Sequence, residues 1–592
     1  MLGLYDRQML EPAVYFATHD PAHIVKTCAA NDKAGSMSCT VLAVNATLPL
    51  HSYTADFPFA VTALTPRADW WDISQIYRAW VLPHAEWTKL GSLEERLAAG
   101  ALPSWLPNIT LWVNNNWGGD PLGPNFGGDP AHVEEEMLAF NRVLDLGRGS
   151  LGLHWYEWDT LGYAFGSNHT QCDRPPAPGI KHANCGFDTH YPNYFPARKG
   201  CKESVASMQA AGMRVIPYIN GQLYDTGLPR FAAENASAAV QKFQAETMAT
   251  SLSPHLEHFD GITSAVMCPH TQYWRNILTQ TIVKACDDIG FDGVYVDQVG
   301  NGEQRNCADP SHGHSINGGA FWAQAFYWIM ADVRSTVQRP SIFMTEGIVE
   351  EVSGAGFDIM LGLHESSGGG TAVWHAVYGG YSLATGHAVA KIGPLASGML
   401  TALTTQFMLG GTMGWFTYQD YCAPETGCQF LNPANAAYVA YIRLLSDARL
   451  AATEWMMHGH LTRDLVLDAS STELMGACFL RDAQPARAAS VVCALALPTN
   501  SSASSTFALS MEPARYGLTA ERTVSLTDLW TGAKLGHYAP GSKVTYAAEV
   551  PAFGVSLLRL VQHPDVEGLG GGILTDRPAE DVRNGTVAAP PV

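Results

Sequence analysis

A repeated pattern between residues 107 and 420 constrains the fold most: a short apolar run, a loop, and then an amphipathic helix. The clearest run is Phe291–Gln298, where Val294, Tyr295 and Val296 lead directly into Asp297. A short β-branched and aromatic run between Asp-Gly and Gly is typical of a buried parallel strand. Further runs of this kind are Ile109–Asn114, Leu151–Asp159, Met213–Gly221, Ser341–Gly347, Phe357–His364 and Gly411–Thr417, with a less legible stretch over 370–395. About eight repeats over roughly 300 residues predict an α/β protein with a closed (β/α)8 TIM barrel.

The segments on either side of the barrel have a different pattern. Residues 1–105 predict a β region with a bridging helix at Trp70–Trp80, and residues 446–562 predict an antiparallel β-sandwich. The barrel itself is expected over 106–445, and a Gly- and Pro-rich tail over 563–592. An open doubly wound sheet is the alternative, but no GxGxxG motif or P-loop follows any of the predicted strands. The closed barrel is therefore favoured.

The charge balance narrows the choice of partners. The 592 residues include 55 acidic and 35 basic side chains, a net charge of −20, which makes nucleic acid and anionic membrane surfaces poor partners. No apolar run approaches the ~20 residues of a membrane span. The sequence predicts no cofactor, and it leaves the oligomeric state open.

Twelve cysteines and six Asn-x-Ser/Thr sequons favour a secreted or lumenal, disulfide-bonded glycoprotein. Neighbouring cysteines suggest the pairs Cys28 with Cys39, Cys172 with Cys185, Cys422 with Cys428 and Cys478 with Cys493. The first seven residues lack the basic start and apolar core of a signal peptide, so we expect an incomplete N-terminus.

Polar side chains stand at the ends of successive predicted strands, which is the face where such barrels hold their chemistry. Asp297 ends the fourth strand and Glu346 ends the fifth. Since adjacent strands lie about 4.8 Å apart, these carboxyl groups can approach the ~5–5.5 Å separation of a retaining glycosidase. Asp297 would then attack the anomeric carbon while Glu346 acts as acid and base. The alternatives are a helix-capping role for Asp297 and an ion pair with arginine for Glu346.

Other residues of the same face are candidates for contact with a sugar: Trp158, Asp159, Tyr218, Asn220, Tyr295, Gln298, His312, His314 and His364. Each has a structural alternative. Trp158 could pack within the barrel, Asp159 could bond to its own loop, and His364 could be a satisfied structural histidine.

One loop also raises the question of a metal site. Cys307, Asp309, His312 and His314 lie within eight residues and could together bind zinc. We favour instead a disulfide between Cys307 and Cys268, with His312 and His314 facing the sugar and no metal bound.

Residues of about 50–420 resemble an uncharacterised family of glycosidase-like barrels, similar to endo-α-N-acetylgalactosaminidase-like and α-amylase-like retaining glycoside hydrolases. The resemblance rests on Asp69–Trp71, Tyr77–Trp80, Pro217–Gly221, Cys268-Pro269, Asp292–Gln298, His312–His314 and Thr345–Gly347. It implies that Asp297 is the nucleophile and Glu346 the acid/base of an enzyme acting on α-linked sugars. Tyr295 stands where a starch enzyme would carry arginine, which favours an α-galactoside or α-N-acetylgalactosaminide.

Two other functions stay open. One is a non-catalytic carbohydrate-binding protein on a glycosidase-like barrel. The other is a metal-dependent hydrolase that uses the His-x-His loop, with Asp297 as a ligand.

Overall fold

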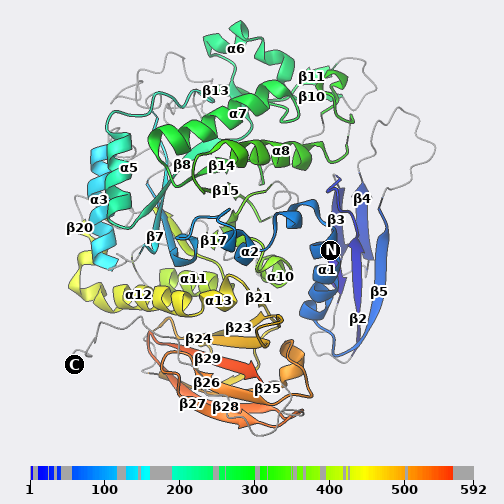
Figure 1. Cartoon of the computed structure of the whole chain (residues 1–592), viewed down its shortest axis with the longest axis vertical. Helices are drawn as coiled ribbons and strands as arrows, with labels where there is room; N and C mark the ends of the chain where they lie inside the picture. The colour runs from blue at the N-terminus through cyan, green and yellow to red at the C-terminus, as the bar shows by residue number, and fades with distance from the viewer. Residues whose placement is uncertain are drawn as a thin grey trace.

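A computed structural model shows the fold. It describes residues 2–4, 11–24, 26–31, 36–41, 57–115, 129–144, 149–159, 190–244, 252–259, 262–300, 307–316, 318–348, 350, 356–363, 369–386, 395, 397–417, 422–423, 427–499 and 504–563. Figure 1 shows a central barrel, with the N-terminal strands beside it and the C-terminal sheets at one end.

The barrel predicted from the sequence is confirmed. Its eight parallel strands are β6 (Leu111–Asn114), β7 (Leu151–Trp155), β8 (Arg214–Asn220), β14 (Gly293–Asp297), β15 (Ile342–Glu346), β16 (Ile359–Leu363), β17 (Leu383–Gly386) and β18 (Met413–Thr417). β18 pairs with β6, and a parallel bridge between Thr385 and Thr412 brings the other edge alongside. The strands are largely buried and mostly apolar because helices cover the outside and side chains fill the lumen.

Helices follow the strands and cover the barrel: α3 (Pro130–Leu144), α5 (Cys201–Ala210), α7 (Gln272–Lys284), α8 (Phe321–Thr336), α10 (Gly369–Tyr378), α11 (Ser397–Met408) and α12 (Ala436–Ala451). On the inner face of α8, apolar side chains recur at helical spacing and are all buried: Trp322, Phe326, Ile329 and Val333. α12 runs past residue 445, the boundary expected from the sequence, and packs against α3 and α11 as part of the helical layer.

Buried charges fix the end of the barrel where the strands begin. Asp358, just before β16, is fully buried and accepts hydrogen bonds from Arg96, Arg334 and the backbone N–H of Phe343. Asp292, just before β14, accepts from the backbone N–H of Val215 at 2.9 Å. These carboxylates are structural, and they leave the opposite end of the strands for a site.

An excursion that the sequence did not reveal leaves the barrel directly after β8. It contains β9 (Leu223–Asp225), α6 (Pro229–Ala233), β10 (Lys242–Gln244), β11 (Leu252–Pro254), β12 (Leu256–Phe259) and β13 (Ile262–Val266). β13 pairs with both β9 and β12, and the chain then enters α7. The excursion therefore lies at the end of the barrel where the strands finish.

The N-terminal region forms a small antiparallel sheet of β1 (Leu2–Leu4), β2 (Pro12–Thr18) and β5 (Phe59–Pro66), with a hairpin of β3 (Lys26–Asn31) and β4 (Ser36–Val41). The expected disulfide Cys28–Cys39 joins that hairpin. The bridging helix α1 (Trp70–His84) begins at Asp69, whose side chain accepts from the N–H groups of Trp71 and Asp72, and it packs against α10.

The C-terminal sandwich is also confirmed. One sheet holds β21 (His460–Leu461), β23 (Met475–Arg481), β24 (Ser490–Ala496), β29 (Val555–Gln562), β26 (Val524–Asp528) and β27 (Lys534–Tyr538); the other holds β22 (Leu467–Ala469), β25 (Ser504–Met511) and β28 (Val544–Pro551). The expected Cys478–Cys493 disulfide links β23 to β24. No helix in the described part of the chain is long and apolar enough to cross a membrane.

Candidate active site

The two predicted catalytic carboxylates end neighbouring strands. β14 and β15 pair in register with Val296 opposite Thr345, and Asp297 and Glu346 are the next residue on each strand. Asp297 is 8% exposed, and Glu346 is half-buried. Parallel pairing therefore brings an acid from each strand to the same edge of the barrel, as the sequence predicted.

Two tyrosines hold the Asp297 carboxylate. The hydroxyl of Tyr218 donates to its Oδ2 at 2.8 Å, and the hydroxyl of Tyr295 donates to its Oδ1 at 3.0 Å. Tyr295 and Asp297 are two residues apart on β14, so both side chains face the lumen, and Tyr218 lies opposite Tyr295 on β8. Two O–H donors favour the ionised form of the carboxylate.

The charges of both acids also affect the pKa of Tyr295. Burial raises the pKa of its hydroxyl well above the ordinary value, and the negative charges of Asp297 and Glu346 add to the effect. The hydroxyl consequently stays protonated at any working pH and keeps donating. Tyr295 therefore lies close enough to both carboxylates for their charges to affect its pKa.

Asn220 and Gln298 shape the backbone beside Asp297. The Oδ1 of Asn220 accepts from the N–H groups of Gln222 and Leu223, and its Nδ2 donates to Oε1 of Gln298 at 3.0 Å. Asn220 is fully buried and Gln298 is half-buried. Asn220 therefore orients the turn after β8, and contact of either amide with a sugar stays a prediction.

Three aromatic residues that the sequence analysis did not select complete the floor of the site. The ring of His154 lies 4.1 Å from that of Tyr295, and its Nδ1 accepts from Nε1 of Trp415 at 2.8 Å. Tyr156 stacks on Tyr218 at 4.7 Å. The alternation of His154 and Tyr156 at the end of the second strand was the available signal, because alternate residues share a face.

Strained backbone gathers at the same end of the barrel. Glu157 and Gln298 adopt left-handed φ angles of 55° and 57° just after β7 and β14, and Trp415 adopts one of 55° in the middle of β18. Residues other than glycine rarely adopt this conformation, and it clusters at functional sites. Glu157 and Gln298 thus lie at the end of the barrel that carries Asp297.

Trp158 is not exposed, as a tryptophan that stacks on a sugar ring would have to be. It is 0% exposed, donates from Nε1 to the carbonyl of Tyr218 at 2.8 Å, and stacks on Tyr194. The ring is therefore fully covered, and the packing alternative replaces the substrate-binding prediction. Asp159 is half-buried, and its backbone bridges Ala197, so its carboxylate stays a candidate.

The structure does not support the predicted contact of His312 and His314 with a sugar. In each ring one nitrogen faces a cysteine sulfur and the other faces a backbone carbonyl, which leaves no nitrogen for a sugar hydroxyl. The predicted disulfide between Cys268 and Cys307 is wrong, because both residues are free thiols. These four side chains form one compact cluster that could hold a metal ion. His364, Cys172 and Cys185 lie outside the described residues.

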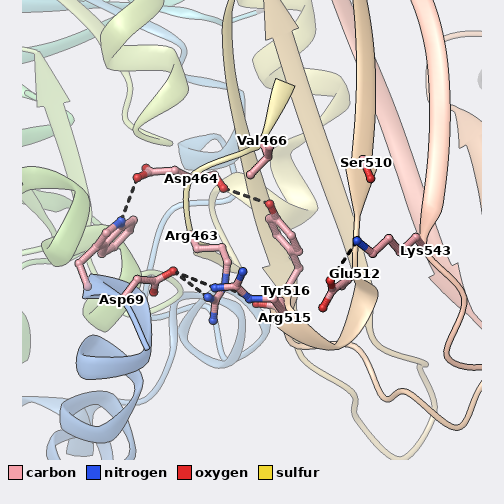
Figure 2. A pocket seen from close by; sticks show the side chains of 10 residues that line it. Asp69, Arg463, Asp464, Val466, Ser510, Glu512, Arg515, Tyr516 and Lys543 are labelled. Carbon is pink, nitrogen blue, oxygen red and sulfur yellow. Dashed lines mark hydrogen bonds and ion pairs between the residues drawn. The ribbon is translucent and has the colours of Figure 1, made fainter. Parts of the chain in front are cut away.

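A cavity of about 590 Å³ lies elsewhere, between α1 and the sandwich. Figure 2 shows its charged lining, in which Arg463 and Arg515 approach Asp69, and Lys543 approaches Glu512. Neither Asp297 nor Glu346 lines it. The arrangement is that of a junction between two domains held by ion pairs, and the barrel mouth remains the candidate for chemistry.

Two family models match the chain. Residues 180–387 match a domain of unknown function, DUF6259, and residues 487–560 match the alpha galactosidase C-terminal beta sandwich domain. The first segment contains Asp297 and Glu346, and the second contains most of the sandwich.

Two curated relatives are each 26% identical to the chain. One, from Monosiga brevicollis, is named "Putative glycoside hydrolase 22789" and aligns over 78% of this chain and 39% of its own length. The other, from Bacteroides thetaiotaomicron, is named "Putative glycoside hydrolase" and aligns over 44% of this chain and 32% of its own length. The chain thus spans less than half the length of these relatives.

A solved structure shares the fold. The α-N-acetylgalactosaminidase NagBb from Bifidobacterium bifidum, in complex with Gal-NHAc-DNJ, matches with a TM-score of 0.51 at 15% identity. The match covers 83% of this chain and 71% of that one. At this identity the match shows a shared fold.

Proposed function

We propose that this chain, which has a glycosidase-like barrel, is a retaining glycoside hydrolase acting on α-linked sugars. One observation carries the proposal: the Asp297 carboxylate is held by two tyrosine hydroxyls, one strand away from Glu346. A buried carboxylate with two O–H donors is suited to stay ionised and attack. The second acid, half-buried and one strand over, is suited to move a proton.

The geometry supports the following roles. Asp297 attacks the anomeric carbon while Glu346 protonates the departing oxygen, and a glycosyl-enzyme forms on Asp297. Glu346 then removes a proton from the water that releases the sugar. Tyr218 and Tyr295 keep the carboxylate of Asp297 in place through both steps.

An α-galactoside or α-N-acetylgalactosaminide is favoured as substrate over starch. In support, the sandwich matches the C-terminal domain of alpha galactosidases, and the similar solved structure is an α-N-acetylgalactosaminidase. Tyr295 adds to this, since its hydroxyl bonds to Asp297 from the position where a starch enzyme has arginine. Carbohydrate is thus the expected partner, and the disulfides Cys28–Cys39 and Cys478–Cys493 support a secreted or lumenal location.

A panel of aryl α- and β-glycosides tests the activity. Wild type should turn over an aryl α-galactoside or α-N-acetylgalactosaminide, and Asp297→Asn and Glu346→Gln should each lower kcat/KM by about 10²-fold or more. Asp468→Asn, an exposed carboxylate of the sandwich, is the matched control and should leave turnover unchanged. Sugar binding without turnover of any glycoside would instead favour the non-catalytic alternative.

A further inference from the structure

Four side chains that the proposed reaction does not use gather beside the excursion. They are Cys268, which lies between β13 and α7, and Cys307, His312 and His314, which lie in the loop between β14 and α8. One ligand atom from each lies within 4.8 Å of the others. Both cysteines and His312 are buried, and His314 is half-buried.

The spacing within the cluster fits a tetrahedral zinc ion. Nδ1 of His312 lies 3.3 Å from Sγ of Cys307, and Nε2 of His314 lies 3.4 Å from Sγ of Cys268. Zinc bonds of about 2.3 Å to sulfur and about 2.0–2.1 Å to nitrogen, at tetrahedral angles, place sulfur and nitrogen about 3.5 Å apart. These two sulfur–nitrogen separations would need to change by only a few tenths of an ångström.

The outer nitrogens of the two imidazoles supply an independent observation. Nε2 of His312 lies 2.9 Å from the carbonyl oxygen of Ala238, and Nδ1 of His314 lies 2.9 Å from that of Ser315. A carbonyl only accepts, so in each neutral ring the outer nitrogen carries the proton. The inner nitrogen then presents its lone pair to the cluster, which is the arrangement of histidines that bind zinc.

We propose that Cys268, Cys307, His312 and His314 bind one zinc ion as a closed structural site. Two thiolates and two imidazoles prefer zinc to the oxygen-seeking Mg²⁺ and Ca²⁺. Four protein ligands fill the tetrahedron, so no position is left for a catalytic water. Asp297 is not among the four, which separates this site from the metal-dependent hydrolase considered from the sequence.

The ion would tie together two loops at the mouth of the barrel. The Cys268 loop is bonded to the excursion through its N–H and the carbonyl of Ala239 at 2.8 Å. The other three ligands lie on the loop that follows Asp297 along the chain. Zinc would therefore hold residues 307–314 against the Cys268 loop, whether or not the chain hydrolyses glycosides.

Metal analysis of the purified wild-type chain tests the proposal. We expect about one zinc per chain, retained on gel filtration, and on exchange with Co²⁺ the visible absorption of a tetrahedral thiolate–cobalt site. Cys268→Ser and His312→Ala should lose most of the zinc. The matched control is Cys286→Ser, another buried free thiol that lies outside the cluster, and it should keep the metal.

Two wild-type results would overturn the proposal without any variant. One is a zinc content near zero in protein purified without chelator and offered Zn²⁺, with Cys268 and Cys307 both open to alkylation. The other is an intact mass that shows a disulfide between these two cysteines. Full zinc occupancy together with no glycosidase activity would leave the zinc site standing and refute the proposed function.

Discussion

Removing the hydroxyl of Tyr295 tests how the site keeps Asp297 ready to react. The O–H of Tyr295 donates to Oδ1 of Asp297 at 3.0 Å in a position that is 1% exposed. Tyr295→Phe keeps the ring and its contact with His154 but leaves that carboxylate oxygen without this donor. The ionised carboxylate loses stabilisation, and the protonated form gains by comparison.

The magnitude follows from the kind of hydrogen bond. A hydrogen bond to a charged group contributes about 1.5–3 kcal/mol, and about 1.36 kcal/mol corresponds to one pH unit. The acidic limb of the kcat/KM profile should therefore move to higher pH by about one to two units in Tyr295→Phe. Tyr218→Phe removes the donor to the other oxygen, at 2.8 Å, and should give a shift in the same direction.

The assay is the pH dependence of kcat/KM for an aryl α-glycoside, measured together with thermal unfolding. Tyr441→Phe is the matched control, because this tyrosine is also buried but its hydroxyl bonds to the neutral Thr404. It should alter stability and leave the acidic limb in place. An acidic limb of Tyr295→Phe that superimposes on wild type would refute the idea that this hydroxyl holds an attacking carboxylate.

Three predictions concern stability. Asp358→Asn leaves Arg96 and Arg334 without their shared buried carboxylate, and calorimetry should show a loss of about 3–5 kcal/mol with unchanged activity per folded molecule. Gly293→Ala puts a Cβ 1.9 Å from the carbonyl oxygen of Ile342, so thermal unfolding should show a loss of more than about 4 kcal/mol in the free energy of unfolding. A near-neutral result would contradict the close approach of β14 and β15 at this position. Burial, with a contribution from the charge of Arg449, lowers the pKa of His375 to about 3. The neutral ring therefore contributes stability above the unfolded pKa of 6.5. That contribution is lost as the pH falls from 6.5 toward 3. At pH 5 the loss should be about 2 kcal/mol, and His375→Gln should show a smaller loss between pH 7 and pH 5 than wild type.

Much of the fold could be read from the sequence because buried parallel strands are apolar on both faces. Val294, Tyr295 and Val296 form such a run and do end at Asp297. The seventh strand, β17, was not legible, since Leu383-Ala384-Thr385-Gly386 is short and only weakly β-forming. The excursion after β8 was missed because its strands are short and mix apolar with polar or charged residues, as in Lys242–Gln244 and Leu256–Phe259.

The site could be predicted only in part. Strand order is enough to put Asp297 beside Glu346, but the hydrogen bonds from Tyr218 and Tyr295 depend on register and ring direction. Trp158 was misassigned because a tryptophan that packs and one that binds sugar look alike in a sequence. Cys268 and Cys307 were expected to pair, and only the structure shows imidazoles facing both sulfurs.

The configuration of azide products from two variants tests the central claim, that Asp297 attacks and Glu346 moves the proton. With an activated aryl α-glycoside and azide, Asp297→Gly should yield the β-glycosyl azide, because azide replaces the missing nucleophile. Glu346→Ala should yield the α-glycosyl azide, because azide attacks the glycosyl-enzyme formed on Asp297. Wild-type turnover in both variants, or the same azide from each, would contradict the assignment.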